Sequence, residues 1–287
     1  MEVKGAVMFR LLLKRFHPDH PKSLLQILPK EESVLILDQA TPQTVISTAE
    51  LQPETLINRV HYSWLLLTLE KMPKSIIRFI VSALPSHQAE KIEQHLQMSP
   101  SQHHYADVVK AFFLNKIYNA LIDPAVLPLD FLPKTPLSFL TSCTKQQLME
   151  IINLLGIYDL AEEVRYILNK ESLNKVHVCL TARQRQFLRQ TLHQKEKVSS
   201  SPLNLKQWDG DCKKLAVSMH RRGLVRLGKA LFGQHPDFIW HLTHILDTGR
   251  GAIIKSHYSL KERPEVAAAL TQQVLSVMKF MNLKDTA

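Results

Sequence analysis

Apolar residues recur every three or four positions along most of this 287-residue chain, as they do on one face of an α-helix. Residues 3–16 and 264–280 both show this spacing. Ser99-Pro100 predicts the start of a further helix, whose shared face consists of Val108, Val109, Phe112, Phe113, Ile117 and Leu121. Alternating apolar and polar runs, which are typical of β-strands, do not recur. The pattern therefore predicts an all-α protein.

Proline opens several of the predicted helices. Residues 20–29 contain Pro-Lys-Ser, an apolar run and a closing Leu-Pro, and residues 72–85 repeat this order. His235-Pro236-Asp237 opens another apolar run without the closing Leu-Pro. Proline suits the first helical turn because its missing amide N–H would have no partner there. Short helices repeated in this way predict a helical array, an architecture that mostly binds other proteins.

A proline-rich segment divides the chain. Four prolines between residues 124 and 136 exclude a continuous helix and predict an extended connector over residues 123–137. The predicted organisation is an N-terminal helical-repeat half (1–122), this connector, and a C-terminal helical half (138–287).

Local signals place the ends of several helices. Thr41-Pro42 predicts the start of a short helix, and proline at 53 predicts a helix that continues over residues 54–69. Thr144 and Thr181 are each followed three residues later by glutamine, which is the spacing of a capping box. Gly156 predicts the end of the helix that starts after Thr144.

Cysteine usage and hydropathy bear on the cellular compartment. The cysteines at 143, 179 and 212 are far apart and include no CxxC pair, which argues against a disulfide framework or a zinc module and favours a reducing compartment. No run of about 18 apolar residues occurs, and the apolar run near the N-terminus is too short for a signal peptide. We therefore expect a soluble, cytoplasmic protein.

The formal net charge of +10 is unevenly distributed. Residues 206–263 contain eleven Lys and Arg against five Asp and Glu, a net charge of +6, and residues 1–30 carry +4. A basic segment can bind nucleic acid, an anionic lipid surface or an acidic protein. Because no nucleic-acid-binding motif is recognisable, we favour a protein partner and keep nucleic acid as the alternative.

Basic residues gather on the predicted helix 212–232, opposite an apolar face formed by leucines and a methionine. A solvated outer face is the alternative interpretation of this pattern. Gly223 and Gly228 each disfavour a helix by about 1 kcal/mol relative to alanine, so they predict a break or a close crossing with another helix. The candidate partner-binding residues are Lys214, Arg221, Arg222, Arg226, Lys229, Trp240 and Arg250.

Two clusters could carry chemistry. His235, His241, His244 and Asp247 have spacings that could place metal ligands on adjacent helix turns, but no His-Glu-x-x-His motif is present and bulky apolar residues share the helix. We therefore favour packed or partner-facing histidines. Residues 248–251 (Thr-Gly-Arg-Gly) could cradle a phosphate, but they lack the P-loop spacing and its lysine, which favours a helix end followed by a turn.

No nucleophile in the sequence is accompanied by an identifiable base. We therefore expect no enzymatic activity, no catalytic residue, no bound metal, no cofactor and no small-molecule substrate.

Three stretches carry a resemblance to a known family. Residues 73–96, in which proline opens a helix that ends near Leu84-Pro85 and a second helix follows, resemble the armadillo-like units of the flagellar motor switch protein FliG. His20-Pro21 and His235-Pro236 match the His-Pro pair of that family's His-Pro-Gln motif but lack its glutamine. Residues 147–161 are similar to its short helices that end in a Gly-x-x-Asp-Leu-Ala turn.

The resemblance implies short helices in a right-handed, armadillo-like array, and a relative of FliG without its charged torque helix. It further implies a non-enzymatic structural or adaptor component of a type III secretion or flagellar-type cytoplasmic ring complex. The partners would be other apparatus proteins, including the cytoplasmic domain of a membrane ring at the inner face of the bacterial inner membrane. The alternative is a nucleic-acid-binding helical protein that uses the basic C-terminal section.

Overall fold

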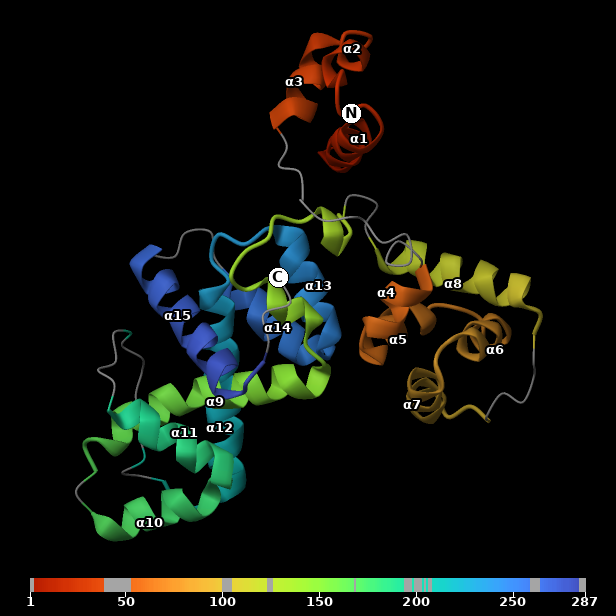
Figure 1. Cartoon of the computed structure of the whole chain (residues 1–287). Coiled ribbons are helices and arrows are strands. Elements are labelled where there is room, and N and C mark those ends of the chain that lie inside the picture. The colour runs from red at the N-terminus through yellow and green to blue at the C-terminus, as the bar shows by residue number, and fades with distance from the viewer. Residues whose placement is uncertain are drawn as a thin grey trace. The chain divides into compact units, whose positions relative to one another are not determined.

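The structure is a computed structural model that describes residues 3–38, 53–99, 105–122, 126–167, 169–193, 208–258 and 264–283, together with positions 198, 203 and 205. Within these residues there are fifteen α-helices, two 3₁₀-helices and no β-strand (Figure 1). The prediction of an all-α protein is confirmed. The helix predicted to start at Thr41-Pro42 lies outside the described residues.

The helices before the proline-rich segment are α1 (Val3–Phe16), α2 (Pro21–Leu25), α3 (Lys30–Asp38), α4 (Pro53–Arg59), α5 (Tyr62–Leu69), α6 (Lys74–Ala83), α7 (Ser86–Leu96) and α8 (Asp107–Leu121). The later elements are η2 (Leu129–Phe131), η3 (Ser138–Ser142), α9 (Lys145–Val164), α10 (Lys170–Cys179), α11 (Ala182–Leu192), α12 (Cys212–Ala230), α13 (Pro236–Ile245), α14 (Thr248–His257) and α15 (Pro264–Phe280). Each Pro-Lys-Ser copy forms a pair of helices, α2 with α3 and α6 with α7.

The chain forms two compact units, and the first is discontinuous in sequence. Unit 1 consists of residues 1–134 and 235–248, and unit 2 of residues 135–234 and 249–287. Hydrogen bonds tie α13 into unit 1: the His61 N–H donates to the His244 carbonyl oxygen (2.7 Å), and the Trp64 indole N–H donates to the Leu246 carbonyl oxygen (2.9 Å).

Residues 54–69 form two helices, α4 and α5, so the prediction of one continuous helix was wrong. The chain turns at His61, whose extended backbone (φ −68°, ψ 135°) interrupts the helix and whose ring nitrogen accepts the Ser63 backbone N–H. The buried amide of Gln88 then donates to the carbonyl oxygens of Ile57 (2.8 Å) and Val60 (2.7 Å) at the end of α4, where Ile57 also accepts the Val60 N–H (3.1 Å). This turn depends on a residue of α7 that is distant in sequence.

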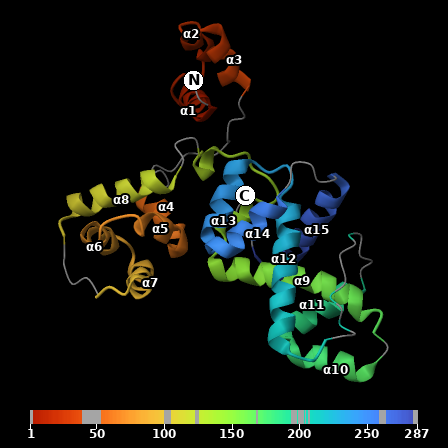
Figure 2. The same ribbon diagram turned by 180° about the vertical axis from the view of Figure 1, so that it is seen from behind.

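Helices α9 and α12 form the centre of unit 2, with α11 packed on α9 and α15 packed on both (Figures 1 and 2). Their backbones touch through two glycines. A Cβ atom added to Gly156 would lie 2.1 Å from the Met219 carbonyl oxygen, and one added to Gly223 would lie 1.8 Å from that of Ile152. Gly156 is therefore a crossing point within one 20-residue helix and not the predicted helix end. The alternative predicted for Gly223, a close crossing, is confirmed.

Other local predictions have mixed outcomes. Both capping boxes form, because Thr144 and Thr181 exchange hydrogen bonds with Gln147 and Gln184. Residues 248–251 lie in the first turn of α14, so the predicted turn at this position was wrong. The part of the connector that the structure describes, residues 126–137, contains η2, and η3 follows it. The right-handed armadillo-like order of the helices stays a prediction.

The described helices were also compared with the requirements of a membrane span. None of them is both long enough and apolar enough to cross a bilayer.

Candidate functional site

Helix α12 carries most of the candidate partner-binding residues and is capped by Asp211. The Asp211 carboxylate accepts the backbone N–H groups of Lys213 (2.8 Å) and Lys214 (3.4 Å), and a cap of this kind contributes about 1 kcal/mol to stability. The cap fixes the start of α12, and the spacing of the apolar residues decides which face of the helix is buried. The buried apolar side chains are Leu215, Met219, Leu224 and Leu227, as the sequence predicts.

The outer side of α12 exposes Lys213, Val217 and Arg221. These residues follow one another at intervals of four, so they lie on successive turns of one helix face. Val217 is 70% exposed. Neither basic side chain forms an ion pair within the part of the chain that the structure describes. We name these three residues the α12 stripe.

Lys214 lies beside the stripe and is paired with an acid. Its Nζ atom is 2.5 Å from Asp209 Oδ2, and both side chains are more than half exposed. The hydrogen bond from Lys214 is the main cause that lowers the pKa of Asp209, and the same bond raises the pKa of Lys214. Lys214 is thus on the surface, with its charge partly compensated.

Arg226 is a core residue, so its predicted position on a partner-binding surface was wrong. It is 5% exposed, and its guanidinium donates twice to Asp159 Oδ1 and once to Gln273 Oε1 (2.7 Å). Asp159 is itself 3% exposed, and the guanidinium of Arg222 lies 3.9 Å from its other oxygen. We therefore remove Arg226 from the partner-binding set. Its side chain lies on the side of α12 that faces α9, where Asp159 is located.

The remaining candidates are Arg250 on α14, Lys229 on α12 and Trp240 on α13. The Arg250 Nε–H donates to His220 Nε2 (2.8 Å), and the other ring nitrogen of His220 bonds to Asn153 Oδ1 (2.7 Å). Arg250 therefore helps to hold α14 against α12. Lys229 is half-buried near the end of α12, and Trp240 belongs to unit 1.

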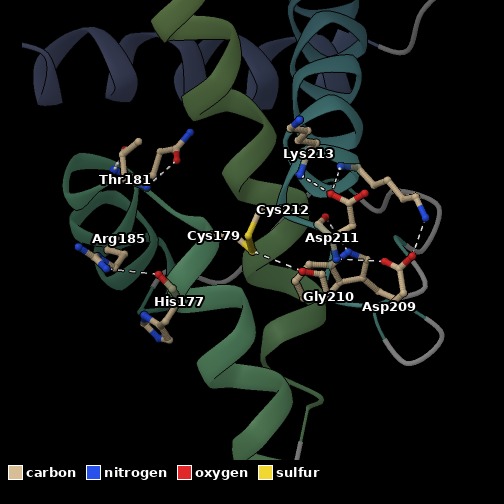
Figure 3. Close-up of a disulfide and its surroundings, with 12 residues drawn as sticks. His177, Cys179, Thr181, Arg185, Asp209, Gly210, Asp211, Cys212 and Lys213 are labelled. Carbon is tan, nitrogen blue, oxygen red and sulfur yellow. Dashed lines mark hydrogen bonds and ion pairs between the residues drawn. A yellow bond between two sulfur atoms is a disulfide. The ribbon is translucent and has the colours of Figure 1, made fainter.

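A disulfide joins Cys179, at the end of α10, to Cys212, at the start of α12, with 4.9 Å between their Cα atoms (Figure 3). This bond contradicts the expectation of no disulfide. The two residues are 33 positions apart and belong to no short motif, so only the packing of α10 on α12 brings them together. The third cysteine, Cys143, is partly buried, and burial raises the pKa of its thiol to about 11.

The histidine cluster of α13 serves the fold. His235 caps the helix by accepting the Asp237 N–H, His241 bonds through Nε2 to the Leu127 carbonyl oxygen (2.8 Å), and the His244 ring bonds to the Trp240 carbonyl oxygen (2.6 Å). Among the described residues, no group of three or more His, Cys, Asp or Glu could hold a metal ion. His241 and His244 are buried, whereas His235 is partly exposed at the start of α13.

Known proteins give no independent guide to these surfaces. Comparison with protein-family models, with curated proteins and with solved structures finds no match to this chain.

Proposed function

We propose that this protein is a non-enzymatic adaptor of a type III secretion or flagellar-type cytoplasmic ring complex, and that it binds another apparatus protein through the α12 stripe. The observation that carries the proposal is the position of Val217, which is 70% exposed between Lys213 and Arg221. The second support is the resemblance of the proline-opened helices to the units of FliG.

An exposed apolar residue between two basic ones favours a protein partner over nucleic acid. Burying a valine side chain completely is worth roughly 2 kcal/mol, which a protein surface provides and a phosphate backbone does not. The stripe itself contains no aromatic side chain on which a base could stack. The partner that fits best has an apolar patch flanked by carboxylates.

The proposed partners are other ring-complex proteins, and the cytoplasmic domain of a membrane ring is one of them. The proposed location is the cytoplasm, at the inner face of the bacterial inner membrane. Both follow from the resemblance, which the helical fold and the surface charge of α12 support.

The experiment that tests the function reverses the charge of the stripe. Tagged wild-type protein and a Lys213→Glu, Arg221→Glu variant are purified from the native cell, and co-purifying proteins are identified by mass spectrometry. We expect ring-complex proteins with the wild type and their loss with the variant, because two favourable charge contacts become repulsive. Both positions are exposed, so the variant should keep its helical circular dichroism spectrum and its midpoint of unfolding.

A Lys74→Glu, Arg78→Glu variant is the matched control. These residues lie on α6, are exposed, and form no ion pair within the described residues, so the change in net charge is the same. Equal loss of partners in both variants would mean that net charge, and not the α12 stripe, decides binding. Recovery of the same ring proteins with the stripe variant would refute the proposed surface. Recovery of DNA or RNA without ring proteins would support the nucleic-acid alternative.

The proposed location has its own test through Cys179 and Cys212. Both sulfur atoms are in residues that solvent reaches at least in part. The bacterial cytoplasm keeps most protein thiols reduced, so trapping with an alkylating reagent before lysis should modify both cysteines. A disulfide already present in cells at the time of trapping would contradict the cytoplasmic location.

A further inference from the structure

Unit 1 contains a cavity of about 50 Å³ whose walls come from α4, α8, α13 and residues 126–129. Most of the lining is apolar and includes the side chains of Leu56, Val60, Ile122 and Val126. None of the lining residues is Asp or Glu. The α12 stripe belongs to unit 2, so the cavity and the stripe share no residue.

The two histidines that line the cavity, His241 and His244, already contact other groups of the protein. His241 Nε2 is bonded to the Leu127 carbonyl oxygen, and burial is the main cause that lowers the pKa of this ring, so it is neutral at pH 7. The His244 ring packs against the indole rings of Trp64 and Trp240, with centroid distances of 4.1 Å and 3.9 Å. Neither ring is therefore the group that would recognise a ligand.

Other polar groups of the lining are available to a ligand. Tyr118 and Trp240 both line the cavity, and neither the hydroxyl nor the indole N–H has a hydrogen bond among the described residues. Arg59 also lines the cavity, and its charge contributes to the low pKa of His241. A guanidinium has five N–H donors, so Arg59 can bind a carboxylate in addition to its contacts within the protein. The polar part of the cavity thus suits an acceptor with negative charge.

The volume limits what the apolar part can hold. A site for one water-sized group needs about 10–15 Å³ on this measure, so about 50 Å³ holds roughly four such groups. A leucine side chain has four carbon atoms. Nucleotides, haem and other large cofactors are several times too large for this space.

We propose that this cavity is an anchor site for one leucine-sized side chain of a partner segment that carries a carboxylate next to the anchor. The aliphatic walls take the side chain, and the donors of Arg59, Tyr118 and Trp240 take the carboxylate. The inference does not depend on the function proposed for the α12 stripe, because the two sites share no residue.

The test uses the full chain, labelled with ¹⁵N, and N-acetyl-leucine as the probe. The probe presents the anchor and a carboxylate together. Binding is followed by the NMR resonance of the Trp240 indole N–H, which a Trp240→Phe variant assigns. N-acetyl-leucinamide lacks the carboxylate, and N-acetylglycine lacks the anchor. A ligand of this small size should bind with a dissociation constant on the order of millimolar.

We expect a saturable shift with N-acetyl-leucine, a several-fold weaker one with the amide and none with N-acetylglycine. Arg59→Gln should weaken N-acetyl-leucine binding by up to about fivefold, as expected for one partly exposed charge contact, and leave the amide unaffected. Thr55→Phe places a ring at the partly exposed rim and should abolish the shift while the spectrum stays folded.

Three results would overturn the proposal: no saturable shift with N-acetyl-leucine, equal shifts with all three probes, or unchanged binding in the folded Thr55→Phe variant. Partner recovery by the stripe variant of α12 does not enter this measurement. The anchor site and the proposed function can therefore fail independently.

Discussion

Replacement of Arg226 with methionine is expected to destabilise unit 2 strongly, because it leaves the Asp159 carboxylate buried without its main partner. Asp159 is 3% exposed and receives two hydrogen bonds from Arg226. Removing one partner of a buried ion pair costs about 3–5 kcal/mol. Arg222 remains 3.9 Å from the carboxylate and keeps part of the attraction, so we expect the lower end, about 3 kcal/mol.

Urea unfolding followed by circular dichroism at 222 nm measures this loss. An Asp159→Asn, Arg226→Met double variant removes both charges with little change in volume at Asp159. It should be more stable than the sum of the two single variants by about 2 kcal/mol, because neither charge is then left alone in the core. Arg221→Met is the matched control on the exposed side of α12 and should change stability by less than about 0.5 kcal/mol.

A cost below about 1 kcal/mol for Arg226→Met, which is within the range of a surface pair, would show that Asp159 does not depend on Arg226 in the core. If that variant were stable but lost its protein partners, Arg226 would return to the candidate binding surface. A double variant that shows strict additivity would refute the direct pairing of the two side chains.

Three further changes test other features. Cys179→Ser should lower stability under oxidising conditions by about 4 kcal/mol, because the disulfide closes a loop of 33 residues. The substitution should cost little once a reductant has opened the bond in the wild type. The same cost in reductant would refute the contribution of the bond. His241→Phe should weaken the fall of stability below pH 6.5. Burial lowers the pKa of His241 in the folded protein below its unfolded value of 6.5, so the unfolded chain takes up the proton first and acid favours unfolding. Unfolding midpoints that change equally between pH 7.5 and 5.5 in the wild type and the variant would contradict this. Gly223→Val should cost at least about 3 kcal/mol in chemical unfolding, because the valine side chain would meet the Ile152 backbone. Gly233→Ala should cost only about 1 kcal/mol, because no atom lies within 4 Å of the added methyl group and only the positive φ disfavours alanine. Equal costs would argue against the tight crossing.

Local sequence signals were sufficient to predict most helices of the described residues. Threonine caps at 144 and 181 and prolines at 73 and 236 act within one or two turns of their own positions, so their consequences can be deduced without the rest of the fold. The helical spacing of apolar residues likewise predicted the buried face of α12.

The errors arose where a distant segment decides the local outcome. Gly156 fits a helix end by sequence, yet it is needed because α12 crosses there. Arg226 has the exposed character of any arginine until Asp159, 67 positions earlier, is placed beside it. The pairing of Cys179 with Cys212 has the same origin. Of the cavity in unit 1, the sequence singled out Trp240 as a candidate partner-binding residue but not the cavity itself, because its walls come from four separate stretches of chain.

The discontinuity of unit 1 has a consequence for protein synthesis. Residues 135–234 are translated after the first part of unit 1 and before α13. At roughly 5–20 residues per second, a ribosome needs about 5–20 s to add this insertion. Throughout that time Trp64 has no Leu246 carbonyl oxygen to bond, and the leucine-sized cavity lacks the wall that Trp240 provides. A nascent chain paused within the insertion would therefore present the apolar faces of α4 and α8 without α13, and these are the surfaces that a ribosome-associated chaperone would meet first.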